Sequence, residues 1–377
     1  RDIAIAVAAA SLAVQDARIV TKASDAAAGG ADDAVLSYPP SRMGVHIGAG
    51  LIAADLDELT AALVEARCDN GTDFDMHEWG SRGMNHLTPL WLLKYLPNML
   101  ACHVTIIHDA QGPSNTITCG EASSGLSIGE SMRVIERGAA DICLCGGVES
   151  KLNPMTFLRQ EMAGRLNAAD NQTPHRAVRP FCKTAAGTAI GEGGAILVLE
   201  ALDTFMRRVK SNEMTNYAEL VGFGASQSVN PPTRSLSPPM DDQGIAVAIR
   251  SALRDAAIGA EDVDLIIPSG LGVPGSDAAE FRVLQSVFGP HLDEVSLVLP
   301  KAMVGNCGAG SGALDIAIAA KALAEQTRPA VINCDQPLDG RDARSAASGP
   351  LTFEHVLTFS SGQGGQNAAL VLRRLRP

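Results

Sequence analysis

A run of small and polar residues between two apolar segments is the part of the chain best suited to chemistry. Asn115–Cys119 is β-prone, Gly120–Gly125 supplies small residues for a tight turn, and apolar residues then recur at helical spacing from Leu126 to Ile135. Such an elbow holds one side chain above the helix N-terminus, where free N–H groups and the helix dipole favour negative charge. Enzymes place nucleophiles at such elbows because the same N–H groups stabilise an oxyanion. The residue at this elbow is Glu121.

The elbow occurs twice. Asn306–Ile316 matches Thr118–Ile128 without a gap, with Cys, Gly, Ser and Leu at the same steps. An earlier element also repeats, because Ile5–Ala8 and Ile245–Ala248 are both Ile-Ala-Val-Ala. Two repeats in the same order, about 190–240 residues apart, predict a duplicated domain rather than a solenoid.

We therefore expect an N-terminal half over 1–214 and a C-terminal half over 215–377. In the second half a predicted strand, 217–228, precedes the repeated helix. The same arrangement in the first half needs a strand before Ile3, and the chain as given holds none. We expect that this first strand is missing from the sequence.

Local patterns predict the remaining elements. We expect helices over 3–19, 55–67, 89–104, 201–213 and 311–323 and strands over 43–50, 141–145, 195–200, 263–270, 330–333 and 368–372. Small residues or glycines predict loops over 22–40, 68–87, 149–189 and 360–367.

Composition excludes some classes of function. The chain has 377 residues, enough for a large core, and its formal net charge of −12 argues against nucleic-acid binding. Local arginine clusters can still dock an acidic carrier protein: Arg133 with Arg137, or Arg207 and Arg208 with Lys210. The eight cysteines lack the paired spacing of a zinc site, so we expect free thiols in a cytoplasmic protein. No apolar run reaches membrane-spanning length.

One loop could suggest a metal site, since His77 and His86 lie near Asp75 and Glu78. A solvated or subunit-contact loop explains these residues better. We therefore expect neither a metal ion nor a cofactor.

Several short stretches in order give the chain a family resemblance. They are Leu96–Met99, Gly112–Pro113, the elbow, Ala140–Gly147, Asn153–Phe157, Arg179–Phe181, Gly191–Gly193, Pro274–Glu280, Lys301–Gly305 and Gly364–Gly365 with Asn367. Across nearly its whole length the chain resembles the β-ketoacyl-(acyl carrier protein) synthase family. The resemblance implies an α/β thiolase-like fold with five αβαβα layers made of two duplicated halves. It also implies dimers that condense a cysteine-bound acyl group with a malonyl-carrier thioester.

The catalytic residues of that family are a cysteine and two histidines. Carried over by motif, the cysteine falls on Glu121, the first histidine on Ser269 and the second on Asn306, while the lysine is present as Lys301. The phenylalanine of the C-terminal glycine-rich loop falls on Gln363. The resemblance further implies substrate contacts at Gln363, Thr188 and Met99.

These substitutions resemble the non-catalytic, chain-length-factor type of subunit. The implied role is that of a non-condensing partner in type II fatty acid or polyketide synthesis, paired with a catalytic ketosynthase subunit or with itself and served by an acyl carrier protein. The resemblance places the strand 115–119 at the dimer interface. The alternatives are an acyl-thioester hydrolase or acyltransferase that uses Glu121, and a homodimeric acyl-binding protein. A decarboxylase is disfavoured because it needs both histidines.

Structural roles also explain several of the residues named above. We expect the Glu121 carboxylate to occupy the former oxyanion hole and cap the following helix, with hydrogen bonds outweighing desolvation. Cys119 and Cys307 each lie two residues before an elbow tip, where a buried structural thiol is the favoured reading over a nucleophile. Lys301 fits a structural ion pair as well as a site residue.

Overall fold

The computed structural model describes residues 1–27, 35–68, 71, 73–208, 217–229, 242–338, 349–350 and 352–375. Its main helices are α1 (Asp2–Asp16), α2 (Lys22–Ala27), α3 (Leu56–Glu65), α4 (Met76–Ser81), α5 (Met99–His108), α6 (Ser123–Glu136), α7 (Pro154–Met162), α8 (Leu202–Arg208), α9 (Asp242–Asp255), α10 (Pro274–Phe288), α11 (Lys301–Val304) and α12 (Ser311–Glu325). Its strands are β1 (Met43–Ala49), β2 (Ser114–Ile117), β3 (Ile142–Ser150), β4 (Glu192–Glu200), β5 (Glu219–Gln227), β6 (Leu265–Ile267), β7 (Ser296–Leu297), β8 (Thr327–Arg328), β9 (Gly349–Pro350), β10 (His355–Ser361) and β11 (Gln366–Arg373).

Two mixed sheets form the body of the molecule. The first has the strand order β2-β1-β3-β4, with β4 antiparallel to its neighbour. The second has the order β7-β6-β10-β11-β5, in which β11 runs antiparallel to both β10 and β5. Read from β2 and from β7, the two sheets have the same arrangement for four strands, and the second then has β5 as a fifth.

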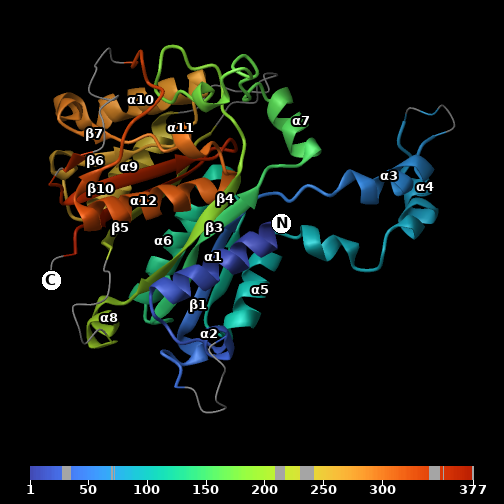
Figure 1. Cartoon of the computed structure of the whole chain (residues 1–377), viewed down its shortest axis with the longest axis horizontal. Helices are drawn as coiled ribbons and strands as arrows, with labels where there is room; N and C mark the ends of the chain where they lie inside the picture. The colour runs from blue at the N-terminus through green and yellow to red at the C-terminus, as the bar shows by residue number, and fades with distance from the viewer. Residues whose placement is uncertain are drawn as a thin grey trace.

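Helices cover both sheets and separate them, as Figure 1 shows. α1 and α5 lie on the outer face of the first sheet, α6 and α12 lie between the sheets, and α9 with α10 covers the second sheet. The side chains alternate accordingly: Leu370 and Leu372 of β11 join the central core, whereas Ala369 and Val371 pack against the outer helices. The five-layer αβαβα fold predicted from the sequence is confirmed.

Some local predictions were wrong. The expected loop over 22–40 contains α2, and the expected irregular stretch over 68–87 contains α4, whose N-terminus is capped by the Asp75 carboxylate accepting from the backbone of His77 and Glu78. Short helices in such stretches have too few turns for a periodic apolar pattern.

The C-terminal region differs more. The apolar run 330–333 is not a strand, because Asn333 adopts a left-handed backbone with φ of 61°, and the short strand β8 precedes it. Conversely, β10 was missed, and Ser360 and Ser361 belong to it rather than to the glycine-rich loop. The predicted helix 201–213 is helical as α8 to Arg208, and the rest lies outside the described residues.

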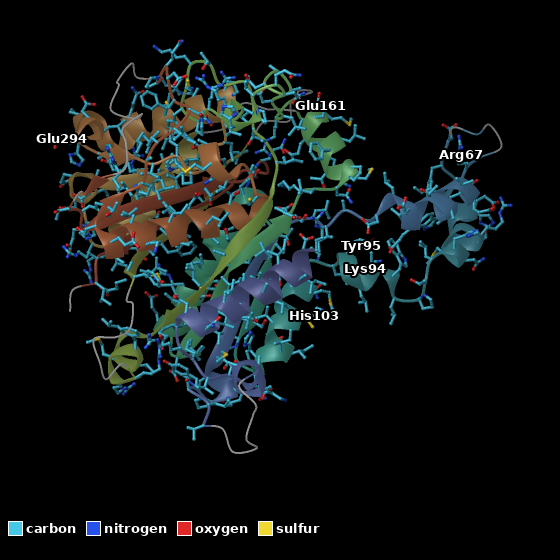
Figure 2. All side chains as sticks on the ribbon, viewed as in Figure 1. Arg67, Lys94, Tyr95, His103, Glu161 and Glu294 are labelled. Atoms are coloured by element: carbon cyan, nitrogen blue, oxygen red, sulfur yellow. The ribbon has the colours of Figure 1, made fainter. Side chains whose placement is uncertain are left out.

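An arm made of α3, α4 and the 3₁₀ helix Gly83–His86 projects from the sheet body (Figure 1). Its base is held by Tyr95, whose hydroxyl donates to a Glu58 oxygen at 2.8 Å, and by an ion pair between Lys94 and Glu58. Tyr95 and Lys94 lie where the arm joins the body (Figure 2). Within the described residues, no helix is both long and apolar enough to cross a bilayer.

Glycine allows the central helix to approach the first sheet. A Cβ atom on Gly48 of β1 would lie 2.5 Å from the backbone nitrogen of Ser124 at the start of α6. Backbone cannot move aside as a flexible side chain can. The elbow therefore sits directly on the sheet.

We predict that Gly48→Ala lowers the free energy of unfolding by about 1–3 kcal/mol, because the added methyl overpacks this contact. Gly275→Ala in α10 is the matched control, since nothing lies within 4 Å of its added Cβ. Urea denaturation followed by circular dichroism measures both. Equal stability of the two variants would contradict the proposed contact.

Candidate functional site

The elbow predicted from the sequence is present. β2 leads through the 3₁₀ turn Gly120–Ala122 into α6, and Gly120 has a positive φ of 58°. The Ser123 hydroxyl fixes the turn by donating to the Gly120 carbonyl at 2.6 Å and accepting from the Cys119 N–H at 2.8 Å. These bonds place Glu121 at the tip.

Glu121 is buried, with 3% of its surface exposed, and its carboxylate is ion-paired. Its Oε1 atom accepts from Nη2 of Arg165 at 2.8 Å and from Nδ2 of Asn306 at 3.0 Å. Burial opposes ionisation, but the charges of Arg165 and Lys151 and the hydrogen bond from Asn306 outweigh it and lower the pKa of Glu121 to about 2. The carboxylate is therefore charged near neutral pH.

Asn306 connects the two elbows. Its Oδ1 atom accepts from the backbone N–H of Gly308 at 2.8 Å and from the Ser311 hydroxyl at 3.3 Å, so it organises the turn that leads into α12. Its amide nitrogen is then free to donate to Glu121 at the first elbow. A second link is the Ser124 hydroxyl of α6, which accepts from the backbone N–H of Ala313 at 2.9 Å.

A second buried ion pair lies beside the first. Lys151 donates to Oε1 of Glu149 at 2.9 Å, and Oε2 of Glu149 accepts from the backbone N–H of Ala309 at 2.7 Å. In the repeat Ala309 corresponds to Glu121, so each elbow tip has a carboxylate beside it. Gly308 is required, because a Cβ there would lie 1.9 Å from Glu149 Oε2. The two carboxylates and two cations together balance charge in the buried site.

The sequence predicts that the Glu121 carboxylate caps the following helix, but the structure gives the carboxylate different partners. Among the described residues, the N-cap residues of the turn and of α6, Cys119 and Ala122, make no side-chain capping bond, and the backbone N–H that Glu121 accepts from is its own. The partners that hold the charge are Arg165 and Asn306, together with the backbone N–H of Glu121 itself. The prediction that hydrogen bonding and charge outweigh desolvation agrees with the lowered pKa, but a guanidinium contributes most of the attraction.

Ser269 and Lys301 lie near this cluster but not in it. The Ser269 hydroxyl accepts from the backbone N–H of Ser361, at the end of the strand whose following loop touches the first elbow. Lys301 is buried and ion-paired with Asp315 of α12. Burial raises the pKa of Asp315 to about 6, partly offset by Lys301. Lys301 therefore forms a structural ion pair, which is one of the two roles that the sequence suggests for it.

The predicted substrate contacts are spread out. The Gln363 amide oxygen lies 3.5 Å from Nη1 of Arg165, so Gln363 borders the cluster. Thr188 is buried and acts through its backbone, which donates to the Arg165 carbonyl at 2.7 Å. Met99 lies elsewhere, at the first residue of α5, in a shallow depression shared with Trp91 and His103. Substrate contact by these three residues stays a prediction.

Neither elbow cysteine is activated as a nucleophile. Burial raises the pKa of the Cys119 thiol and of the Cys307 thiol, whereas a reactive cysteine needs a lowered pKa. In the part of the chain that the structure describes, no group of three or more His, Cys, Asp or Glu side chains could hold a metal ion.

Sequence reasoning missed Arg165, Glu149 and Lys151. Arg165 follows α7 in a predicted loop and is 44 positions from its partner, so spacing could not connect the two. Glu149 and Lys151 had a usable signal, because two opposite charges flank Ser150, the last residue of the buried strand β3. Charges at the end of a buried parallel strand are rarely left unpaired.

Comparisons with known proteins agree with this geometry. The model of the β-ketoacyl synthase N-terminal domain matches residues 4–204, and that of the C-terminal domain matches residues 217–335. A 3-oxoacyl-[acyl-carrier-protein] synthase 2 of Coxiella burnetii is 31% identical over 78% of this chain and 69% of that protein. The tetracenomycin polyketide synthase ketoacyl synthase beta subunit of Streptomyces glaucescens is 31% identical over 86% of this chain and 78% of that protein.

Solved structures show the same fold. A type II PKS acyl-carrier protein in complex with its ketosynthase bound to the hexaketide has a chain with a TM-score of 0.82 at 23% identity, over 99% of this chain and 85% of that one. The ishigamide ketosynthase/chain length factor gives 0.79 at 24% identity, over 100% and 82%. The architecture is that of a thiolase-like ketosynthase fold. The chain belongs to the β-ketoacyl synthase family.

We predict that Glu121→Gln lowers the free energy of unfolding by about 3–5 kcal/mol, because it leaves the buried Arg165 guanidinium without its counter-charge. The double variant Glu121→Gln/Arg165→Met removes both charges, so its loss is smaller than the sum of the single losses. A double-mutant cycle by urea denaturation measures this.

The matched control for that cycle is Glu325→Gln, which breaks an exposed pair with Lys321 and leaves stability nearly unchanged. If the double variant loses as much unfolding free energy as the two single variants together, the Glu121–Arg165 pair is not coupled.

Two buried carboxyl groups of α10, Asp277 and Glu280, predict that the stability of the protein depends on pH. Burial raises the pKa of Asp277 to about 7 and that of Glu280 to about 8. A carboxyl whose pKa is higher in the folded protein than in the unfolded chain loses stability as pH rises between those two values. Because the unfolded value is near 4.5, we predict that the stability contributed by these two carboxyls is lost from about pH 5 to pH 8.

Glu280→Gln reduces that slope, because its amide carries no titrating proton and its oxygen still accepts from the Gly270 N–H. Urea denaturation at pH 5.5, 7 and 8.5 measures the slope, with the exposed Glu161→Gln on α7 as the control (Figure 2). A slope unchanged in Glu280→Gln would contradict the assignment.

Proposed function

We propose that this chain is a non-condensing subunit of the chain-length-factor type, acting in type II fatty acid or polyketide synthesis beside a catalytic ketosynthase subunit. The observation that carries the proposal is the ion-paired Glu121 at the elbow tip. Thioester condensation in this family starts from a thiolate at that position, and a carboxylate with a pKa of about 2 is a poor nucleophile toward thioesters. Its charge also repels a malonyl carboxylate.

The residues at the other two catalytic positions support the same proposal. If Ser269 and Asn306 occupy the positions of the two histidines, neither supplies an imidazole for the enolate formed on decarboxylation. Asn306 is also fully engaged, since its oxygen organises the second elbow and its nitrogen donates to Glu121. The beta-subunit relative and the ketosynthase/chain length factor neighbour favour a paired role, whereas the relative from Coxiella burnetii is named as a synthase.

Hydrolysis by Glu121 is the weaker candidate. A general base works best when its pKa is near the working pH, and Arg165 holds this carboxylate far below it. Water would also have to displace Arg165 or Asn306 to reach the carboxylate oxygen that they share. The ion pair therefore favours a structural role, and the same argument disfavours an acyltransferase that uses Glu121.

Two exposed features of the molecule support a protein partner. β2 is the outermost strand of the first sheet among the described residues, and an open strand edge favours pairing with another chain. The projecting arm exposes large apolar side chains, among them Leu63, Val64, Met76 and Met84. We propose that these surfaces contact a second ketosynthase-type subunit, either a catalytic one or a second copy of this chain.

Three arginines of the clusters predicted to dock an acyl carrier protein are ion-paired within the chain, whereas Arg207 donates to the Thr204 hydroxyl. Arg133 pairs with Glu136 and Asp255, and Arg137 with Glu130. Arg208 pairs with Glu200, and Lys210 lies outside the described residues. An acyl carrier protein remains part of the proposal through the family, but these clusters do not carry it.

We predict that the purified chain forms no β-ketoacyl product from acyl- and malonyl-carrier substrates. Losing one oxyanion-hole donor alone lowers a rate about 10²–10³-fold, and here the nucleophile is replaced as well. Mass spectrometry of the carrier thioesters measures the product. Condensation above the level of a Glu121→Ala control would overturn the proposal.

Glu121→Cys tests access to the elbow in the same assay. A cysteine at position 121 accepts an acyl group from a reactive thioester, visible as an adduct on the intact chain, yet it does not restore condensation. Recovery of condensation by this single change would contradict the roles proposed for Ser269 and Asn306.

A further inference from the structure

Two cysteines that are far apart in sequence, Cys182 and Cys334, lie close together in the second half of the molecule. Cys182 belongs to the loop between α7 and β4, and Cys334 belongs to the segment that follows β8. Both side chains are buried, and both are part of the core that packs against α9 and α10. No role in the proposed function falls on either thiol.

The backbone brings the two cysteines to the same peptide group. Cys182 forms an antiparallel β-bridge with Pro337. The Leu338 N–H donates to the Phe181 carbonyl at 3.0 Å, and the Cys334 Sγ atom lies 3.7 Å from the same oxygen. Standard peptide dimensions place that oxygen about 2.8 Å from the Cys182 Cα, so the Cys334 sulfur is within about 6.5 Å of that Cα. This separation is of the size that disulfide-bonded cysteines span, whose Cα atoms lie about 4.4–6.8 Å apart.

The surroundings of Cys182 favour its thiolate. Its Sγ atom lies 3.2 Å from the Thr184 hydroxyl, which can donate to a negatively charged sulfur. Burial opposes ionisation, but hydrogen bonds from the side chain and backbone of Thr184 and from the backbone of Gln336, with the charge of Arg179, outweigh it and lower the pKa of the thiol. The thiolate is the form of cysteine that attacks an oxidant.

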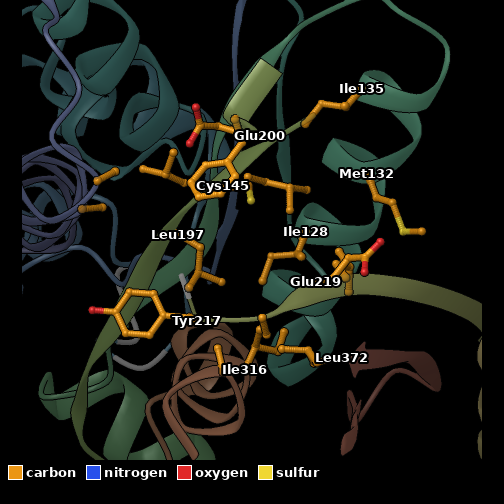
Figure 3. A pocket seen from close by; sticks show the side chains of 18 of the residues that line it. Ile128, Met132, Ile135, Cys145, Leu197, Glu200, Tyr217, Glu219, Ile316 and Leu372 are labelled. Atoms are coloured by element: carbon orange, nitrogen blue, oxygen red, sulfur yellow. The ribbon is translucent and has the colours of Figure 1, made fainter. Parts of the chain in front are cut away.

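Other buried cysteines have a different environment. Cys145 lies at an apolar pocket between β4, α6 and α12 (Figure 3), and burial raises the pKa of its thiol. Burial likewise raises the pKa of Cys143 and of Cys307. These thiols stay protonated near neutral pH, so each is a poor target for an oxidant.

The pair lies directly beneath solvent-exposed residues of both segments. Lys183 and Thr184 follow Cys182 and are exposed, and Asp335 and Gln336 follow Cys334 and are also exposed. An oxidant little larger than water needs only a small opening between such side chains. Hydrogen peroxide is of that size, and it reacts with thiolates.

We propose that Cys182 and Cys334 form a reversible oxidation site, which hydrogen peroxide converts into a disulfide. The Cys182 thiolate attacks a peroxide oxygen, so that an S–O bond forms, the O–O bond breaks and hydroxide leaves. The Cys334 thiol then attacks the sulfenic sulfur of Cys182, so that the S–S bond forms and the hydroxyl group leaves as water with the proton of Cys334. Two thiols lose two electrons in total, and the peroxide is reduced to two waters. A dithiol reductant reverses the change by thiol–disulfide exchange.

The disulfide fastens the loop that carries Arg165. The Thr188 N–H donates to the Arg165 carbonyl at 2.7 Å, so the two ends of this loop are joined to each other. An ion pair between Arg176 and Asp335 links the loop to the segment after β8, but both side chains are exposed and such pairs hold weakly. A covalent bond across the same contact restrains the loop, and with it the partner of Glu121, more firmly.

Oxidation of the folded chain followed by peptide mapping tests the pair. The protein is treated with hydrogen peroxide, blocked with N-ethylmaleimide in urea and digested with trypsin without reduction. We expect a cross-linked species that joins peptide 177–183 to peptide 322–341, at least tenfold more abundant than in the untreated chain and separated by dithiothreitol. The midpoint of urea unfolding rises with the cross-link and returns to its starting value on reduction.

Three variants accompany the wild-type chain. Cys182→Ser and Cys334→Ser each abolish the cross-linked species and the shift in the urea midpoint. Cys102→Ser is the matched control, because Cys102 is a partly buried cysteine of α5, away from the pair, and this variant keeps both effects.

Three outcomes contradict the proposal. Cys182 could be oxidised to the sulfinic or sulfonic acid with no cross-linked peptide, which would place Cys334 out of reach. The cross-link could form only after the chain is unfolded in urea, which would show that the folded protein keeps the oxidant away. The cross-link could form in the folded chain and leave the urea midpoint unchanged, which would show that it does not fasten the loop.

Discussion

The ion pair between Glu121 and Arg165 is the interaction on which the centre of this molecule depends. Moving either charge out of water costs several kcal/mol, so each is tolerable only with the other beside it. Asn306 completes the arrangement by donating to the same carboxylate while its oxygen organises the second elbow. The position of one carboxylate therefore sets the relation between two elbows, whose bonded residues Glu121 and Asn306 are 185 residues apart in sequence.

A charged group at the elbow also explains why the surrounding pocket keeps its cations. If a neutral or only transiently charged nucleophile stood at position 121, the buried Arg165 guanidinium would need a different anion beside it. Here Glu121 is the anion for Arg165, and Glu149 is the anion for Lys151. Burial raises the pKa of Glu149 and Glu121 adds to that rise, while Lys151 lowers the pKa of both carboxyls. Each of the two buried cations therefore has a carboxylate beside it.

The sequence predicted the parts of the fold that leave a periodic or repeated signal. The duplicated elbows, the Ile-Ala-Val-Ala helices and most of the long apolar strands were visible, with β10 the exception, and they define the five layers. The short elements were not, because α2, α4 and β8 are too brief for a pattern and Asn333 turns an apolar run out of strand geometry. At the site, Glu121 and Asn306 were found through the repeat and the family resemblance. Arg165 was not, because an ion pair across 44 residues depends on how a loop after α7 folds back.

The packing around the two elbows also determines whether the two halves can unfold independently. α6 belongs to the first half by sequence, yet it packs on β11 and β5 of the second sheet, and α12 of the second half packs on β3 and β4 of the first. The Ser124–Ala313 hydrogen bond and the Asn306–Glu121 bond cross the same boundary. Neither half can bury its middle helix alone, so a nick between them would sever the chain without creating two independent folding units. The sequence is repeated, but residues of both halves share one central core.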